Sequence, residues 1–118
     1  MKITIEKLQG IDIAVLQGDT LDAHTTKEFK KNICPILAAA CTTGRLVLDL
    51  GQLTFIDSSG IGALISCLSR MNAKSGQFCL CGVGSTIRGA FEMVNLDRIM
   101  PIHATREAAV ASILAAKA

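Results

Sequence analysis

The chain alternates short apolar segments of strand character with longer segments of helical periodicity, and this alternation constrains the fold more than any other feature. Residues 3–5 and 11–15 alternate apolar and polar side chains on either side of Gln9-Gly10, which predicts a β-hairpin with one buried face. Residues 45–50 are mainly apolar and residues 78–81 are a continuous apolar run, as is typical of strands covered on both faces. Both kinds of strand are therefore expected in one sheet.

Four further segments carry apolar residues at intervals of three and four, which predicts helices. The first follows a polar loop over Gly18–His24 and ends at residues 42–44, with a kink or break near Asn32 because Pro35 lies inside it. The segment Arg98–Ile102 predicts a short strand, which its proline would confine to a sheet edge. The other three helices are expected from Ser58 to about Lys74, around residues 87–94, and at about Thr105–Ala116. The buried stripe expected for the helix at Ser58 is Ile61, Leu64, Ile65, Leu68 and Met71.

Strands alternating with helices predict an α/β fold with a mixed sheet of four to five strands and about four α-helices. Half of the residues are apolar, so the chain can bury a real core, and its length predicts one domain over residues 1–118. The net charge is +2 with no run of Lys or Arg, and Tyr and Trp are absent, which argues against a nucleic-acid partner. The longest uncharged stretches, 32–44 and 58–69, fall short of the roughly 20 residues of a spanning helix, so no membrane insertion is expected.

The five cysteines are scattered, and no pair has the spacing of a zinc site. Cys79 and Cys81 lie two apart in an expected strand, so they share a face and should pack as small hydrophobic residues. Free thiols fit a reducing cytoplasm.

The sequence lacks a complete set of residues for any of the catalytic sites considered. Two glycine-rich segments, 60–65 and 84–91, resemble phosphate loops, but the first lacks its third glycine and the second lacks the lysine that would neutralise phosphate charge. Nothing places His24 or His103 beside a nucleophile. Asp12 has no acidic neighbour to help hold the magnesium ion of a phosphorylated receiver domain. We therefore expect a non-enzymatic protein without a cofactor or metal.

One stretch, Asp57-Ser58-Ser59-Gly60-Ile61-Gly62, stands between an apolar segment and an amphipathic helix. Asp and Ser are favoured N-cap residues, so these letters alone predict only a helix start. Two hydroxyls and two glycines in the first turn, however, leave backbone N–H groups with little side-chain cover. A phosphate on a first-turn serine would lie at the positive end of the helix dipole and add about −1.5 to −2 charge. The fold could therefore survive a modification that changes the charge of a binding surface.

At this motif the sequence resembles a STAS domain, and most closely a bacterial anti-sigma factor antagonist. Residues 46–62 resemble the family signature almost position by position, and Gly76 and the helical segment 87–96 match as well. The resemblance covers essentially the whole chain, which predicts a single STAS domain.

The resemblance implies a regulatory role. In that family an antagonist binds a serine protein kinase that is also the anti-sigma factor, and so releases the sigma factor. The kinase phosphorylates the serine after the Asp, which here is Ser58, with Ser59 as the second candidate, and a serine phosphatase reverses this. Asp22, in a loop one residue longer than is usual, is the counterpart of a partner-contacting Asp. The implied partner surface is Asp22, Asp57, Ser58, Ser59, Gly60, Ile61 and Gly62.

Two other interpretations of the function remain open. A STAS accessory module of a lipid or anion transport system is the alternative, although such modules often lack the phosphoacceptor. A nucleotide-binding domain is the third reading, against which the two failed phosphate loops argue. We expect the free protein to be a monomer.

Overall fold

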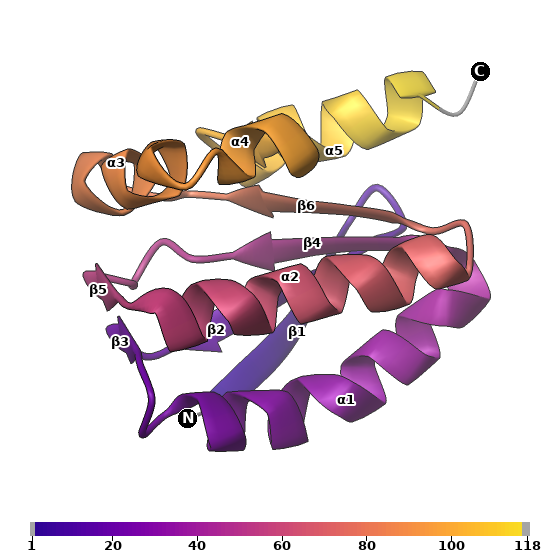
Figure 1. The fold of residues 1–118 in the computed structure, drawn as a ribbon. Helices are drawn as coiled ribbons and strands as arrows, with labels where there is room; N and C mark the ends of the chain where they lie inside the picture. Colours follow the sequence, from indigo (N-terminus) through magenta and orange to yellow (C-terminus); the bar gives the residue numbers. More distant parts are fainter. Residues whose placement is uncertain (1, 117–118) are drawn as a thin grey trace.

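The computed structural model describes residues 2–116, apart from the side chains of residues 41–43 and 116. These residues form a five-stranded sheet, a separate two-stranded sheet and five helices (Figure 1). The α/β fold and mixed sheet predicted above are confirmed, with one short helix more than expected. The strands are β1 (Lys2–Leu8), β2 (Ile11–Gln17), β3 (Thr20–Leu21), β4 (Arg45–Asp49), β5 (Phe55–Ile56), β6 (Gln77–Cys81) and β7 (Ile102–His103). The helices are α1 (Thr26–Thr43), α2 (Ser58–Ala73), α3 (Ser85–Met93), α4 (Leu96–Ile99) and α5 (Arg106–Ala116).

The main sheet has the order β1-β2-β4-β6-β7. β1 and β2 form the expected antiparallel hairpin, with Gln9 and Gly10 at its turn, and every later pairing is parallel. β4 lies in the middle, and its apolar side chains Leu46, Val47 and Leu48 are buried on both faces, as its mainly apolar sequence predicted. β3 and β5 pair with each other in parallel, outside the main sheet.

Two apolar cores lie on the two faces of the main sheet. On one face Leu46, Leu48 and Leu80 pack with buried residues of α1, α2 and α3. On the other face Val47 packs in the cluster that holds Val110 and Ile113 of α5. Figure 1 shows α1 and α2 side by side in front of the sheet, with α5 beyond β6. The sheet is therefore covered unequally, by several helices on one face and by α5 on the other.

The cysteine prediction is confirmed for Cys79 and Cys81, which are buried together in the smaller core under α5. Burial raises the pKa of each thiol to about 12, so both stay protonated at neutral pH. The Cys41 side chain lies outside the described residues.

α1 runs without a break from Thr26 to Thr43, so of the two outcomes expected near Asn32, a kink or a break, the break does not occur. Pro35 lies inside the helix on its exposed side, while Phe29 and Leu37 are buried on either side of it along the chain. Burial of these flanking side chains offsets the hydrogen bond that a proline removes.

α2 begins at Ser58, as predicted, but its buried stripe differs from the expected one. Leu64, Leu68 and Met71 are buried, whereas Ile65 is 37% exposed and Ile61 is half-buried. Gly60, Ala63 and Cys67 are buried in their place. The helix therefore turns its small residues inward, where the sheet and the β3–β5 pair lie close.

The segment after α3 also differs from the prediction. Residues 98–102 do not form one strand: α4 occupies the first part and β7 begins only at Ile102. β7 does lie at the sheet edge, next to Pro101, as the proline predicted. Val94, the last residue of the helix expected around residues 87–94, follows the last residue of α3 and is 54% exposed. In residues 2–116 no helix has the length and apolar character that crossing a bilayer requires.

Candidate functional site

The first turn of α2 is fixed by the side chain of Asp57. Asp57 has an extended backbone, and its Oδ1 accepts a hydrogen bond from the Gly60 backbone N–H at 3.1 Å. This is N-cap geometry, and it satisfies one of the backbone donors that a helix start leaves unpaired. Ser58 and Ser59 follow in the first turn, and both are exposed. The motif therefore presents two adjacent serines on a rigid helix start.

The same carboxylate also holds a second segment that is distant in the sequence. Asp57 Oδ2 accepts from the backbone N–H of Ala23 at 3.3 Å, and the Asp57 backbone N–H donates to the carbonyl of Leu21 at 3.2 Å. The carbonyl of Asp19 accepts from the backbone N–H groups of Thr54 and Phe55. The loop before α1 and the segment before α2 are thus joined at one end of the molecule.

Gly60 is required for this close approach. A Cβ at this position would lie 2.3 Å from the Leu21 carbonyl oxygen and 2.7 Å from Cγ1 of Ile56. Gly62, by contrast, has nothing within 4 Å of its Cβ position and is exposed. The two glycines of the motif therefore have different roles, and only Gly60 has a steric one.

Asp22 lies at the same end and shapes its own loop. Its Oδ1 accepts from the backbone N–H groups of His24 at 2.9 Å and Thr25 at 3.1 Å, and Thr25 Oγ1 accepts from the Asp22 N–H. The hydrogen bond from the Thr25 N–H has the largest effect and lowers the pKa of Asp22 below its usual value. Desolvation opposes this effect, and the bond from the His24 N–H adds to it. Asp22 therefore remains ionised and sets the loop before α1.

The predicted residues fall into one neighbourhood. Asp22, Asp57, Ser58, Ser59 and Gly60 meet where the joined loops reach the start of α2, while Ile61 is half-buried and Gly62 lies one turn further along α2. Within the described part of the chain no group of three or more His, Cys, Asp or Glu is placed to hold a metal ion.

Two residues at this end were not predicted. Ala23 contributes only a backbone N–H, which has no sequence signature. Phe55, on β5, is 52% exposed. A single aromatic residue two positions before Asp57 was the only available signal for Phe55.

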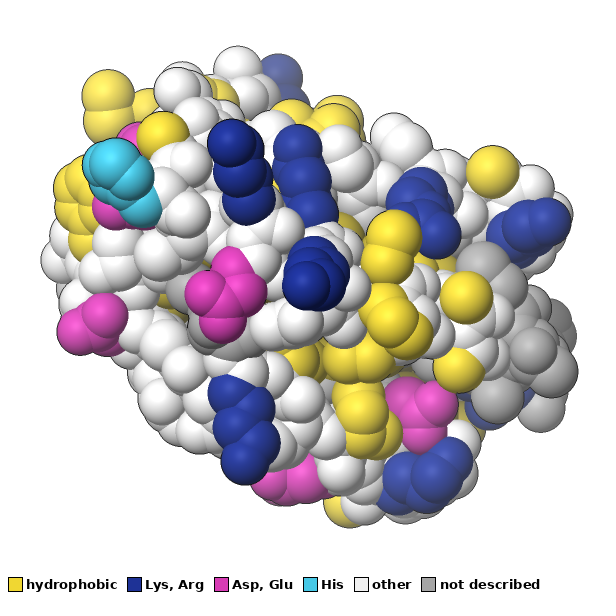
Figure 2. Space-filling model, turned by 90° about the horizontal axis from the view of Figure 1, so that it is seen from below, with side chains coloured by type: hydrophobic (Ala, Val, Ile, Leu, Met, Phe, Trp, Pro, Cys, Tyr) yellow, Lys and Arg dark blue, Asp and Glu magenta, His cyan; other side chains and the backbone are white. Residues whose placement is uncertain are grey.

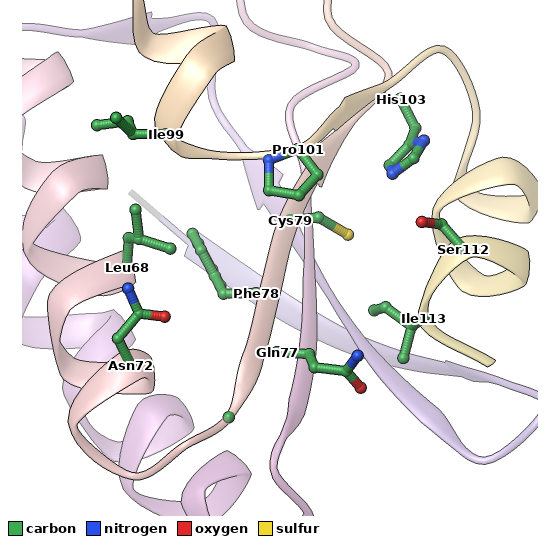
Figure 3. A pocket seen from close by; sticks show the side chains of 11 residues that line it. Leu68, Asn72, Gln77, Phe78, Cys79, Ile99, Pro101, His103, Ser112 and Ile113 are labelled. Atoms are coloured by element: carbon green, nitrogen blue, oxygen red, sulfur yellow. The ribbon is translucent and has the colours of Figure 1, made fainter. Parts of the chain in front are cut away.

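A separate hollow of about 260 Å³ lies at the open edge of β6. β7 pairs only with Leu80 and Cys81, so the first half of β6 has no strand on the side away from β4, and the hollow occupies that place. Figure 3 shows the His103 ring pointing toward Cys79 and Ser112, and its Nε2 is buried without a partner among the described residues. None of the predicted site residues lines this hollow, so it is distinct from the site at α2.

Comparison with known proteins supports this assignment of the fold. The family model described as the STAS domain matches residues 2–109. BtrV of Bordetella bronchiseptica is 33% identical over 114 residues, covering 95% of this chain and 94% of that protein. The anti-sigma F factor antagonist of Paenibacillus polymyxa is 32% identical over 104 residues, covering 87% of this chain and 86% of the relative. The structure of the Bacillus cell fate determinant SpoIIAA in its phosphorylated form has a TM-score of 0.62 at 23% identity, covering 95% of this chain and 99% of SpoIIAA. The chain belongs to the STAS domain family.

Proposed function

We propose that this protein is an anti-sigma factor antagonist whose unphosphorylated form binds a serine-kinase anti-sigma factor and whose binding is reversed by phosphorylation of Ser58. The observation that carries the proposal is the exposed serine at the first position of α2, directly after the Asp57 cap. The names of two compared proteins support it, because one is an anti-sigma F factor antagonist and the other is SpoIIAA in its phosphorylated form.

The environment of Ser58 suits a switch by charge. A phosphate here would be stabilised by the positive end of α2, so the helix would tolerate it. The Asp57 carboxylate is bound to Gly60 and Ala23 and stays in place. A docked partner must already desolvate this carboxylate, and a dianion beside it would add repulsion and further desolvation cost. One phosphate would therefore weaken docking without unfolding the protein.

The other site residues have supporting roles in this proposal. Asp22, Ser59, Ile61 and Gly62 would form the partner surface around Ser58, and Gly60 would hold α2 against β3. The protein would act by binding, with the kinase and a serine phosphatase supplying the chemistry. The free protein would be a monomer.

The test is phosphorylation by the serine-kinase anti-sigma factor of the same organism with ATP, followed by mass spectrometry of the peptides. We expect phosphate on Ser58 of the wild type and none on Ser58→Ala. Ser69→Ala, an exposed serine further along α2, is the matched control and should be phosphorylated as the wild type is. Phosphate at a position other than Ser58 or Ser59 would contradict the proposal.

A binding measurement completes the test. Ser58→Asp should bind the kinase at least about tenfold more weakly than the wild type, because the added charge faces a desolvated interface. Equal binding by Ser58→Asp and the wild type would rule out the switch. Absence of phosphorylation together with copurification with a transport ATPase subunit would favour the transport alternative.

A further inference from the structure

The hollow at the edge of β6 lies where a further strand would continue the main sheet. β7 pairs with Leu80 and Cys81, and the hollow lies beside the residues of β6 that precede them. At about 3.3 Å per residue, the open edge from Gln77 to Cys79 is roughly 7 Å long. This edge therefore has length for about three residues of an extended chain.

The strand register leaves both backbone groups of Phe78 without a partner. Successive residues of a parallel strand bond to alternate edges: the Gln77 N–H donates to the Gly44 carbonyl on the β4 side, and the Leu80 N–H donates to the Pro101 carbonyl on the β7 side. Phe78 therefore points its N–H and C=O toward the hollow. In the register of β6 and β7 its carbonyl meets position 101, where proline has no N–H to donate. No residue of the described chain bonds to either group, although Phe78 is buried.

The side chains around the hollow lie on two sides of β6. Figure 3 shows Leu68, Phe78 and Ile99 on one side, and Cys79, His103 and Ser112 on the other. A strand in this place would therefore direct alternate side chains toward α2 and α4, and toward α5. The side next to α5 holds the buried His103 Nε2, for which the described residues provide no hydrogen-bond partner.

The lining of the hollow is uncharged. None of the described residues that line it is Asp, Glu, Lys or Arg. Figure 2, which looks onto the side that carries α1, shows Lys and Arg side chains gathered there, whereas the hollow lies between β6, α4 and α5. A phosphate or carboxylate in the hollow would lose water without gaining a cation. The lining therefore favours an uncharged occupant.

From the unpaired edge and the uncharged lining we infer that this hollow binds an extended, uncharged segment of a partner protein, which adds a short strand beside β6. The central residue of the segment exchanges two hydrogen bonds with the N–H and C=O of Phe78. Residues directly opposite each other share a face of the sheet, so its side chain lies against Leu68 and Ile99 and is apolar. The neighbouring residues face α5, where a Ser or Thr hydroxyl would bond to His103 Nε2. The inference goes beyond the proposed function, because none of the residues of the Ser58 site lines the hollow.

A peptide segment matches this edge better than a compact small molecule. The N–H and C=O of Phe78 complement the two amides that flank one peptide residue. A small ligand with one trans amide has its N–H and C=O on opposite sides, so it meets only one of these groups.

A second copy of this chain is also a poorer occupant. β1 forms the other edge of the main sheet, and each of its apolar residues, Ile3, Ile5 and Leu8, has a charged neighbour in the sequence. A segment of β1 would therefore bring a charge into the uncharged hollow.

The test uses an acetylated and amidated peptide, Ser-Thr-Leu-Thr-Ser, titrated into the isotopically labelled full chain. Its control is the same peptide N-methylated at Leu, which removes the N–H that would donate to the Phe78 carbonyl. The unmodified peptide should give saturable shifts of the amides of Gln77, Phe78 and His103, with a dissociation constant below about 5 mM. The N-methylated peptide should bind at least about tenfold more weakly, because the Phe78 carbonyl then stays unpaired.

Two substitutions on α5 make the test specific. Ser112→Lys places a charged side chain at the hollow, whereas Ala111→Lys changes the adjacent exposed position, which does not line it. Ser112→Lys should weaken binding of the peptide at least about tenfold, and Ala111→Lys should leave it within about twofold of the wild type.

Four outcomes would overturn the inference: equal weakening by both variants, equal binding of the N-methylated peptide, shifts confined to residues outside the hollow, or no saturable binding. Tighter binding of 2-pyrrolidinone, a small cyclic amide, at the same residues would also overturn it in favour of a small-molecule site. Because neither kinase nor phosphate is used, the result is independent of whether Ser58 is the phosphoacceptor.

Discussion

At the residue scale, Gly60 has the sharpest steric requirement in the site. Gly60→Ala places a methyl group 2.3 Å from a backbone oxygen of β3, which cannot move without breaking the β3–β5 pair. We expect this change to lower the free energy of unfolding by about 3 kcal/mol. Gly62→Ala is the control, and it should raise stability by about 0.5 to 1 kcal/mol because the position is open and helical. Urea denaturation measures both, and equal effects would show that the close approach at Gly60 is not needed.

Asp22 should make the free energy of unfolding depend on pH in the acid range. Its folded-state pKa lies below the unfolded value of 3.8, so its contribution is fully present above that pH and is lost as the pH falls through the lower folded value. Asp22→Asn keeps a side-chain oxygen as acceptor but has no charge to titrate. The stability advantage of the wild type over Asp22→Asn should therefore be constant near pH 6 and shrink below about pH 4. Thermal unfolding across this range is the measurement, and a constant difference down to pH 2 would contradict the assignment.

At the element scale, α1 contains a proline that it tolerates rather than requires. Pro35 lies on the exposed side of the helix, where it provides no backbone donor to the turn before it. Pro35→Ala should restore that hydrogen bond and raise the free energy of unfolding by about 1 to 2 kcal/mol, after allowance for the greater freedom of the unfolded chain. Denaturant unfolding of the variant tests this, and a loss of stability would mean that the ring itself stabilises α1.

The same helix shows what could be predicted from sequence. Local periodicity predicted α1, α2, α3, α5 and the hairpin, because their apolar residues repeat at the period of the element they form. The break that was one of the two outcomes expected near Asn32 does not occur, because burial of Phe29 and Leu37 is a tertiary effect that overrides a local rule. β3 and β5 have two residues each, too few for a period, and they form only because two distant segments meet.

The candidate site was likewise predicted from the sequence only in part. Asp57 and the two serines were predicted because an N-cap has a characteristic sequence. The bond from Ala23 to Asp57 joins positions 34 residues apart through a backbone N–H, which every residue but proline has. The side of α2 that faces the core was also mispredicted at Ile65, since small residues rather than large ones face the close contact.

At the scale of the whole molecule, Arg106 joins three elements across the sheet. Its guanidinium bonds Glu6 of β1 and, at 2.7 Å, Asp49 of β4, and both bonds raise the pKa of the arginine. Arg106→Lys leaves one ammonium, which cannot bond both carboxylates in this geometry, so the unfolding free energy should fall by about 1 kcal/mol and by more at low salt. Arg88→Lys, in an exposed pair with Glu92, is the matched control and should change it by less than about 0.5 kcal/mol. Equal effects in urea denaturation would show that Arg106 does not join the elements energetically.

The double attachment of Asp57, to its own helix and to Ala23, has an immunological consequence. The surface around Ser58 is a discontinuous epitope, because it is assembled from two stretches that a linear peptide does not contain together. An antibody raised against the folded protein at this surface should fail to recognise a blot of the denatured chain. Such an antibody would report in living cells on how much of the protein is folded.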